Sequence, residues 1–278
     1  MIFLRPQGGL ANRIRVISSA IWLSKITSHK LNVIWEINSD LNCDYNTLFC
    51  ENEEFNLIPF PAKFKYLHHT NNPKFSKRVK AYFRNRFLGI QYNLNESDFL
   101  FRGFSEVEKI RRVARLNKNL FISTTQAFGE WREHVHCINF HQDIVNRIKK
   151  DELKLSNNTI GLHIRRTDNL IAIQNSPFEL FEKLIERLSK NSANQIFFLA
   201  TDDENIKNKL CNSYSNVKTF RHQLNRNSEE GMINAAIDIL TLSKCQTIYG
   251  SYWSSYSTLA SLIGKCALKI VHLNNNDF

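Results

Sequence analysis

The sequence lacks several features that define large protein classes. Its 278 residues contain no stretch near the roughly 18 uninterrupted apolar residues that indicate a membrane-spanning helix. The N-terminus has neither a basic region nor a long apolar run, so no signal peptide is predicted. There is no internal repeat, and no low-complexity tract beyond the asparagine-rich C-terminus. We therefore expect a cytoplasmic globular protein with one large domain or two medium ones.

The six cysteines also lack a pattern. None of them forms a C-x-x-C pair, so neither a zinc site nor a disulfide framework is predicted, and we expect reduced thiols. No D-x-D motif or other acidic cluster indicates another metal. The cysteines are Cys43, Cys50, Cys137, Cys211, Cys245 and Cys266.

Positive charge, by contrast, is in excess. The formal net charge is +11 and the isoelectric point is near 9.4, which favours an anionic partner such as nucleic acid, a lipid surface or a phosphorylated small molecule. Nucleic acid is not predicted, because the basic residues are spread widely and no recognised nucleic-acid motif occurs. The basic and aromatic segment Lys74–Arg86 predicts a helix with a solvated face; the alternative is a patch for an anionic acceptor or a membrane surface.

Strand-like and helix-like patterns alternate along the chain, which predicts an α/β protein with parallel sheets. A polar stretch, Leu155–Thr159, predicts a domain junction, with domains at 1–157 and 158–278. The strand-like runs are Ile2–Arg5, Asn32–Glu36, Leu57–Phe60, Thr159–Arg165, Ile196–Thr201, Val217–Phe220, Thr247–Tyr249 and Leu268–Leu273. The main helical patterns are Ile14–Ile26, Pro177–Lys190, Glu204–Ser213 and Glu229–Ser243.

Residues 161–169, GLHIRRTDN, end a predicted strand in an unusual group of side chains. In a parallel α/β sheet, ligands bind beyond the carboxyl ends of the strands, so Arg165 and Arg166 mark the rim of such a crevice, with His163 beside them. Guanidinium groups fork onto phosphate oxygens, which favours a pyrophosphate ligand. The alternative is an Arg–Asp salt bridge that closes the strand end.

Residues 8–15, GGLANRIR, connect the first predicted strand and helix. Gly8 and Gly9 permit a tight turn, and a helix N-terminus attracts anions. Arg13 and Arg15 run against the helix dipole, a conflict that a bound anion would remove. The stretch is neither a Walker A loop nor a G-x-G-x-x-G fingerprint, and the alternative is an ordinary turn with Asn12 as the cap.

Two further stretches place acids and hydroxyls at strand ends. In Ile196–Glu204, one of Asp202 and Asp203 can cap the next helix, which leaves the other for a ribose or sugar hydroxyl. Asp238 lies in an apolar helical stretch, where a buried carboxylate needs a partner. The donors of a guanine ring fit this need, and the alternative is a neighbouring arginine. In residues 250–255, GSYWSS, glycine and small hydroxyls let backbone N–H groups approach a phosphate, or the serine is an ordinary helix cap.

These four stretches, in this order, resemble the GDP-fucose-dependent fucosyltransferase superfamily, which contains α-1,6-fucosyltransferases, nodulation fucosyltransferases and protein O-fucosyltransferases. HIRRTD resembles its first motif, ATDD its second, DIL…GSYWSS its third, and GGLANR its N-terminal glycine-rich loop. The resemblance covers residues 1–25 and about 159–263.

The resemblance implies a GT-B-like α/β fold, in which two Rossmann-like domains face each other across a cleft and the C-terminal one holds GDP. It implies metal-independent transfer of L-fucose, with inversion, from GDP-fucose to a glycan hydroxyl, without a cofactor. It assigns guanine to His163 and Asp238, the β-phosphate to Arg165, and an electrostatic or structural role to Arg166. The other residues that it assigns to the donor are Gly9, Asn12, Asp202, Asp203, Ser254 and Ser255.

One part of the family pattern is missing. Where the α-1,6 enzymes have a lysine and then a glutamate, this sequence has Asn169 and Ile173. Three alternatives are therefore open for the general base: Asp168 itself, some residue of the N-terminal domain, or no base at all. The alternatives to fucosyl transfer are the use of another GDP-sugar and an inactive GDP- or anion-binding protein of the same fold. We expect the glycan acceptor to be assembled on the cytosolic side of a membrane, whose anionic surface the positive charge would favour.

Overall fold

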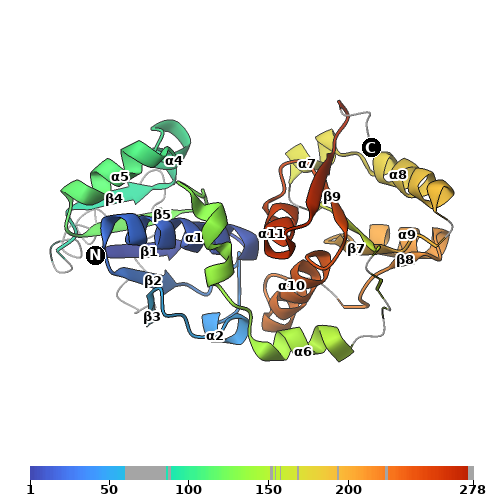
Figure 1. The fold of residues 1–278 in the computed structure, drawn as a ribbon, viewed down its shortest axis with the longest axis horizontal. Helices are drawn as coiled ribbons and strands as arrows, with labels where there is room; N and C mark the ends of the chain where they lie inside the picture. Colours follow the sequence, from blue (N-terminus) through green and yellow to red (C-terminus); the bar gives the residue numbers. More distant parts are fainter. Residues whose placement is uncertain are drawn as a thin grey trace. The chain divides into compact units, whose positions relative to one another are not determined.

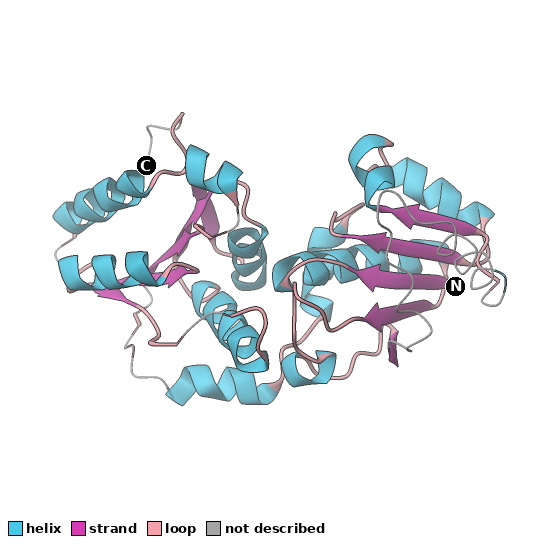
Figure 2. Cartoon of the chain, turned by 180° about the vertical axis from the view of Figure 1, so that it is seen from behind, coloured by secondary structure: helices cyan, strands magenta, loops and turns pink. Residues whose placement is uncertain are grey.

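The chain forms two compact units, residues Met1–Asn139 and Phe140–Phe278, each built around its own parallel sheet (Figures 1 and 2). The computed structural model describes residues 1–59, 86, 89–150, 153, 155–156, 158–167, 169–192, 194–222 and 225–274. Most of the predicted helix at Lys74–Arg86 lies outside these residues, as does Asp168.

The N-terminal sheet has the strand order β3-β2-β1-β5-β4. Every residue of its three inner strands is buried, as is usual for parallel strands that are covered on both faces. The strands are β1 (Ile2–Pro6), β2 (Leu31–Trp35), β3 (Asn56–Pro59), β4 (Tyr92–Asn95) and β5 (Leu120–Thr124). The helices are α1 (Leu10–Thr27), α2 (Tyr45–Leu48), α4 (Glu96–Phe101), α5 (Val107–Leu116) and the 3-10 helix η2 (Trp131–Cys137).

The C-terminal sheet has the strand order β10-β9-β6-β7-β8. Its core joins the apolar residues of β6 and β7 to the inner face of α8. The strands are β6 (Ile160–Ile164), β7 (Phe197–Thr201), β8 (Val217–Lys218), β9 (Thr247–Ser251) and β10 (Ala267–Val271). The helices are α6 (Gln142–Lys150), α7 (Leu170–Asn175), α8 (Phe178–Asn191), α9 (Glu204–Ser213), α10 (Glu229–Leu242) and α11 (Ser255–Gly264).

The strand order places a candidate crevice in each sheet. In the C-terminal unit the chain builds β7 and β8 on one side of β6, then returns to build β9 and β10 on the other side (Figure 1). The order therefore reverses between β6 and β9, and a crevice opens beyond their carboxyl ends. The same reversal occurs between β1 and β5 in the N-terminal unit.

The alternation of strands and helices that the sequence predicts is confirmed, and so is the α/β class with two parallel sheets. Two strands were not predicted. β4 (YNLN) carries two asparagines, and β5 (LFIST) is too short to be distinguished from other apolar runs. β5 becomes a strand because it pairs with β1, and β4 becomes a strand because it pairs with β5.

The division between the units follows Asn139, whereas the predicted boundary follows residue 157. Helix α6 belongs to the C-terminal unit because it packs on α10, where Arg147 and Glu230 form an ion pair of 2.7 Å. The polar stretch Leu155–Thr159 thus lies inside the C-terminal unit, between α6 and β6. Among the described helices, none has the length and apolar character needed to cross a bilayer. All six cysteines carry free thiols.

Candidate functional site

His163 lies at the carboxyl end of β6 and is only 4% exposed. The ring of Tyr256 stacks on it, with centroids 4.8 Å apart, and the Ser254 hydroxyl lies 3.3 Å from its Nδ1. Burial, reinforced by the charge of Arg165 and opposed by Asp202, lowers the pKa of His163 to about 4. The imidazole is therefore neutral at pH 7 and serves as a hydrogen-bonding group.

Arg165 is the first residue after β6, and its backbone ties the two strands of the crevice together. Its N–H donates to the Ser251 hydroxyl at the end of β9 (3.0 Å), and that hydroxyl lies 3.3 Å from the His163 carbonyl oxygen, to which it donates. The guanidinium pairs with Asp202 at 3.1 Å and keeps 17% of its side-chain surface exposed. It is thus held in place at the crevice with part of its surface available to a ligand.

The Arg166 side chain contacts the end of α7 and not Asp202. Its guanidinium donates to the carbonyl oxygens of Ile173 (3.4 Å) and Ser176 (2.7 Å), at the end of α7. Burial lowers its pKa, with nearby carboxylates opposing the shift. The geometry supports a structural role for Arg166, because carbonyl groups at a helix end need donors.

The two acids of the ATDD stretch are both engaged by the protein. Asp202 accepts from the Arg166 N–H and the Thr167 hydroxyl, each at 2.7 Å, besides its ion pair with Arg165. Burial favours its neutral form, but Arg165 and these donors outweigh burial and lower its pKa. Asp203 caps α9 through the N–H groups of the two residues after Glu204. The predicted capping is thus found, and the other acid contacts the arginine loop where a sugar hydroxyl was expected.

Asp238 is buried on α10, and its partner is a residue that the sequence did not indicate. Its Oδ1 lies 3.2 Å from His222 Nε2, and the His222 ring stacks on Phe220 with centroids 5.2 Å apart. Burial raises the pKa of Asp238, and His222 opposes that shift. The signal that could have indicated His222 is its place a few residues after β8, because the carboxyl ends of parallel strands share one edge.

The turn from β9 to α11 depends on Gly250. A Cβ at this position would lie 2.5 Å from the Ser257 hydroxyl, so only glycine allows the helix to approach the strand. Ser254 is the N-cap of α11 but makes no side-chain bond to the helix, and the first turn, from Ser255 on, carries no acid. The amide groups at this helix end, beside His163 and Arg165, favour an anion.

The glycine-rich loop of the N-terminal unit forms the turn before α1. Gly8 adopts the left-handed region (φ 78°), and Gly9 is the N-cap. Asn12 does not cap the helix; its Oδ1 accepts from Arg15 at 3.4 Å. The predicted contacts of Gly9 and Asn12 with a donor stay predictions, since they require the other unit.

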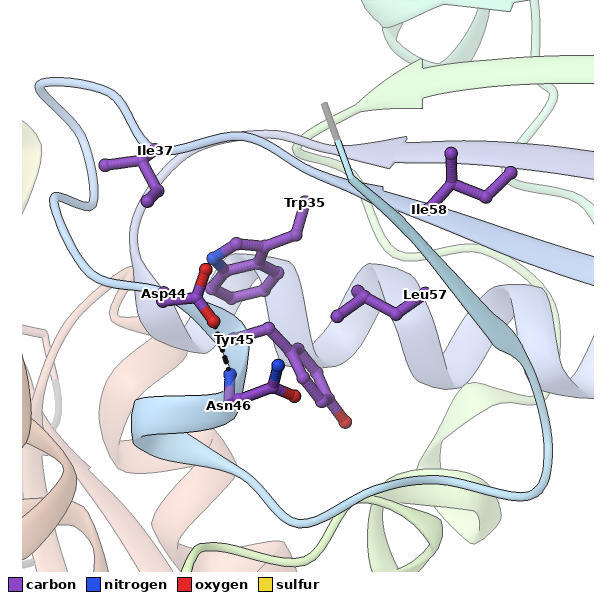
Figure 3. A pocket seen from close by; sticks show the side chains of 7 residues that line it. All are labelled: Trp35, Ile37, Asp44, Tyr45, Asn46, Leu57 and Ile58. Carbon is purple, nitrogen blue, oxygen red and sulfur yellow. Dashed lines mark hydrogen bonds between the residues drawn. The ribbon is translucent and has the colours of Figure 1, made fainter. Parts of the chain in front are cut away.

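A cavity of about 540 Å³ lies at the carboxyl ends of β2 and β3 in the N-terminal unit (Figure 3). Its lining combines rings and aliphatic chains with two polar side chains: Trp35, Ile37, Asp44, Tyr45, Asn46, Leu57 and Ile58. Asp44 Oδ1 accepts from the Asn46 N–H at 2.9 Å, as the dashed line shows. The hydroxyl of Tyr45 is buried, with the Asn52 side chain near it, and burial raises its pKa. Such a lining suits a small polar ligand with an apolar face.

Metal-binding side chains do not gather anywhere in the described ranges: no group of three or more His, Cys, Asp or Glu residues could hold an ion there.

The low pKa of His163 predicts an acid-sensitive fold. The unfolded state binds a proton near pH 6.5 and the folded state only near pH 4, so stability is present above pH 6.5 and is lost as the pH falls towards 4. We expect the free energy of unfolding from urea titrations to fall by a few kcal/mol over this range. In His163→Asn this pH dependence should flatten, whereas His141→Asn, at a partly exposed site, should keep it. The prediction would be contradicted if the free energy of unfolding changed equally with pH in the unsubstituted chain, His163→Asn and His141→Asn.

No protein-family model matches the sequence, and no curated protein matches it. Solved structures do match. The fucosyltransferase NodZ from Bradyrhizobium is similar over 100% of this chain and 96% of its own, with 16% identity and a TM-score of 0.65. A variant of Arabidopsis thaliana FUT1 in complex with GDP matches over 99% of this chain and 70% of its own, at 16% identity and a TM-score of 0.64.

POFUT1 in complex with GDP-fucose matches over 97% of both chains, at 11% identity and a TM-score of 0.59. At these identities the likeness concerns the fold. It confirms the GT-B-like fold that the motifs imply, with one Rossmann-like sheet in each unit.

Proposed function

We propose that this protein is an inverting, metal-independent glycosyltransferase that moves L-fucose from GDP-fucose to a hydroxyl of a glycan. The observation that carries the proposal is the position of Arg165. It stands at the switch point of the C-terminal sheet, beside a neutral buried histidine and the uncapped N-terminus of α11. The four motifs that resemble the superfamily and the fold shared with NodZ and POFUT1 support the same donor.

The C-terminal unit has what a leaving GDP requires. Cleavage of the sugar–phosphate bond builds negative charge on the diphosphate, which Arg165 and the amide groups of α11 can stabilise. Asp238 and the neutral His163 can hydrogen-bond the donor and acceptor groups of guanine. Asp202 holds the arginine loop in place and so acts as a positioning residue.

Inversion requires a single displacement, helped by a base that takes the proton of the acceptor hydroxyl. We keep Asp168 as the proposed base. Asn169 cannot act as one, because an amide is not basic. Its side chain has a structural role: it caps α7 and donates to the Trp253 carbonyl oxygen. Glu96 in the N-terminal unit is also unsuited. Burial favours its proton, but hydrogen bonds from Thr124, Thr125 and Gln126 outweigh burial and lower its pKa.

Calorimetry tests the donor. We expect GDP to bind the purified chain in metal-free buffer containing a chelator, and ADP and UDP to bind at least about tenfold more weakly, because their bases lack the guanine donors. GDP-fucose should be hydrolysed slowly to GDP and fucose, and faster than other GDP-sugars. The absence of GDP binding without metal would refute the proposal.

A second candidate is an inactive GDP-binding protein of the same fold. The observation in its favour is the missing glutamate, in whose place this sequence has Ile173. It would be supported by tight GDP binding together with no hydrolysis or transfer from any GDP-sugar. Faster hydrolysis of a GDP-sugar other than GDP-fucose would instead identify a transferase with a different donor.

A further inference from the structure

Two arginines of the N-terminal unit share one tryptophan ring. The Arg15 guanidinium lies 5.1 Å from the centre of the Trp131 ring, and that of Arg132 lies 5.2 Å from it. Arg15 belongs to α1, and the other two residues belong to η2, which packs against α1. Two cations are thus brought together by elements far apart in the sequence.

Arg13, two residues earlier on the same helix, shows what a structural arginine looks like in this unit. It donates to the carbonyl oxygens of Gly8 (2.8 Å) and Glu36 (2.5 Å) and to Asn38 Oδ1 (3.0 Å). Burial lowers its pKa to about 10, and the carboxylates of Glu36 and Asp40 oppose that shift. Each nitrogen of its guanidinium thus donates to an oxygen of the protein.

The guanidinium of Arg15 has fewer hydrogen-bond partners than that of Arg13. Its one hydrogen bond within the described residues is the 3.4 Å contact with Asn12, and its buried Nε has no partner there. Burial lowers its pKa and Arg132 lowers it further. Neither Arg15 nor Arg132 is within ion-pair distance of any described carboxylate. A largely buried cation beside a second cation is costly unless an anion joins them.

Arg15 lies in the second turn of α1, towards the positive end of the helix dipole. Glu130 and Glu133 flank Trp131 and Arg132 in the chain, but no ion pair joins them to either arginine within the described residues. The N-cap of α1, Gly9, makes no side-chain bond to the helix, and the first turn has no acidic residue. Stacking on an indole also leaves the edges of a guanidinium free, and these edges carry the N–H groups that fork onto carboxylate or phosphate oxygens.

We propose that Arg15 and Arg132, supported by Trp131, form an oxyanion-binding subsite, and that the acceptor glycan carries an acidic group that binds there. The second part rests on the proposed function. The acceptor is the source of the anion because the diphosphate of the donor has its own arginine and helix N-terminus in the C-terminal unit. The ligand chemistry is a carboxylate, as in a uronic acid, or a phosphate ester.

The test uses the full chain and small probes. The indole N–H resonance of Trp131, assigned with Trp131→Phe, is followed during titration with inorganic phosphate, glucuronate and glucose. We expect the two anions to shift it in a saturable way and glucose to leave it unchanged. Tighter binding of phosphate indicates a phosphorylated acceptor, and tighter binding of glucuronate a uronic acid. No shift with either anion would overturn the subsite.

Variants separate the subsite from general charge. Arg132→Ala should weaken anion binding about tenfold or more, because one charge-assisted pair is lost. Arg132 is exposed, so the fold should persist, and Arg15→Gln should act in the same direction. Arg112→Ala removes one exposed charge from α5 of the same unit and should change nothing. If Arg112→Ala weakened anion binding as much as Arg132→Ala does, the binding would come from the overall positive charge of the unit, and the subsite would be refuted.

GDP calorimetry on the same variants distinguishes the two proposals. We expect the GDP affinity of Arg132→Ala to equal that of the unsubstituted chain; Arg15→Gln is left out of this comparison because Arg15 donates to Asn12, which is assigned to the donor. A loss of GDP affinity would assign the anion to the donor and overturn the acceptor assignment. Failure of the chain to bind GDP at all would refute the proposed function but leave the anion titration at Trp131 as an independent result.

Discussion

Replacing Arg165 by alanine is expected to lower the rate of sugar transfer or GDP-fucose hydrolysis about 10³-fold. The guanidinium is the one fixed positive side chain that we place beside the leaving diphosphate, and its loss leaves the developing charge to the amide groups of α11. Single-turnover assays at saturating GDP-fucose measure this loss in the chemical step. Arg165→Lys should retain part of the rate, because an ammonium keeps the charge but cannot fork.

The neighbouring arginine is the matched control. Arg166→Ala removes the donors from the end of α7, so it should lower the melting temperature more than Arg165→Ala does and the rate per folded molecule less. In Arg165→Ala, Asp202 loses its ion pair but keeps its bonds to the Arg166 N–H and the Thr167 hydroxyl. If the two variants lost rate equally at equal folded fraction, Arg165 would have no special place in the reaction.

Asp238→Asn is expected to weaken GDP binding about 100-fold, which corresponds to about 3 kcal/mol. A carboxylate can accept from both the N1–H and the 2-amino group of guanine, whereas an amide presents one oxygen and a donor that opposes them. Because Asp238 is buried, water cannot replace the missing acceptor. Calorimetry with GDP and with inosine diphosphate, which lacks the 2-amino group, measures the effect.

The preference between these two nucleotides is the sharper readout. The unsubstituted chain should prefer GDP to inosine diphosphate, and Asp238→Asn should lose most of this preference. Asp143→Asn removes a charge from an exposed position of the same unit and is expected to bind both nucleotides normally. If Asp238→Asn kept the preference for GDP, guanine would be recognised elsewhere, and the His222–Asp238 contact would be purely structural.

Local patterns were sufficient for much of the fold. Mainly apolar runs such as IFLRP and IGLHI became central strands because parallel strands are covered on both faces. Asp203 became a cap because acids at strand-to-helix turns accept from free amides. The strand YNLN escaped prediction because its identity comes from pairing with β5. The unit boundary escaped it because α6 is held by α10, which lies far along the chain.

The sequence by itself determined the chemistry that this protein has available: an α/β chain with arginines, a histidine and small hydroxyls at the carboxyl ends of its strands. Only the tertiary structure decided which partners hold each of these side chains. Arg165 and Arg166 are adjacent and carry the same side chain, yet Arg165 pairs with Asp202 and Arg166 donates to carbonyl oxygens at the end of α7. Arg13 donates to two backbone carbonyls, whereas the Nε of Arg15 has no partner within the described residues. The reason is physical. Whether a buried charge still needs a ligand depends on the partners that distant segments bring to it, and a local pattern does not contain them.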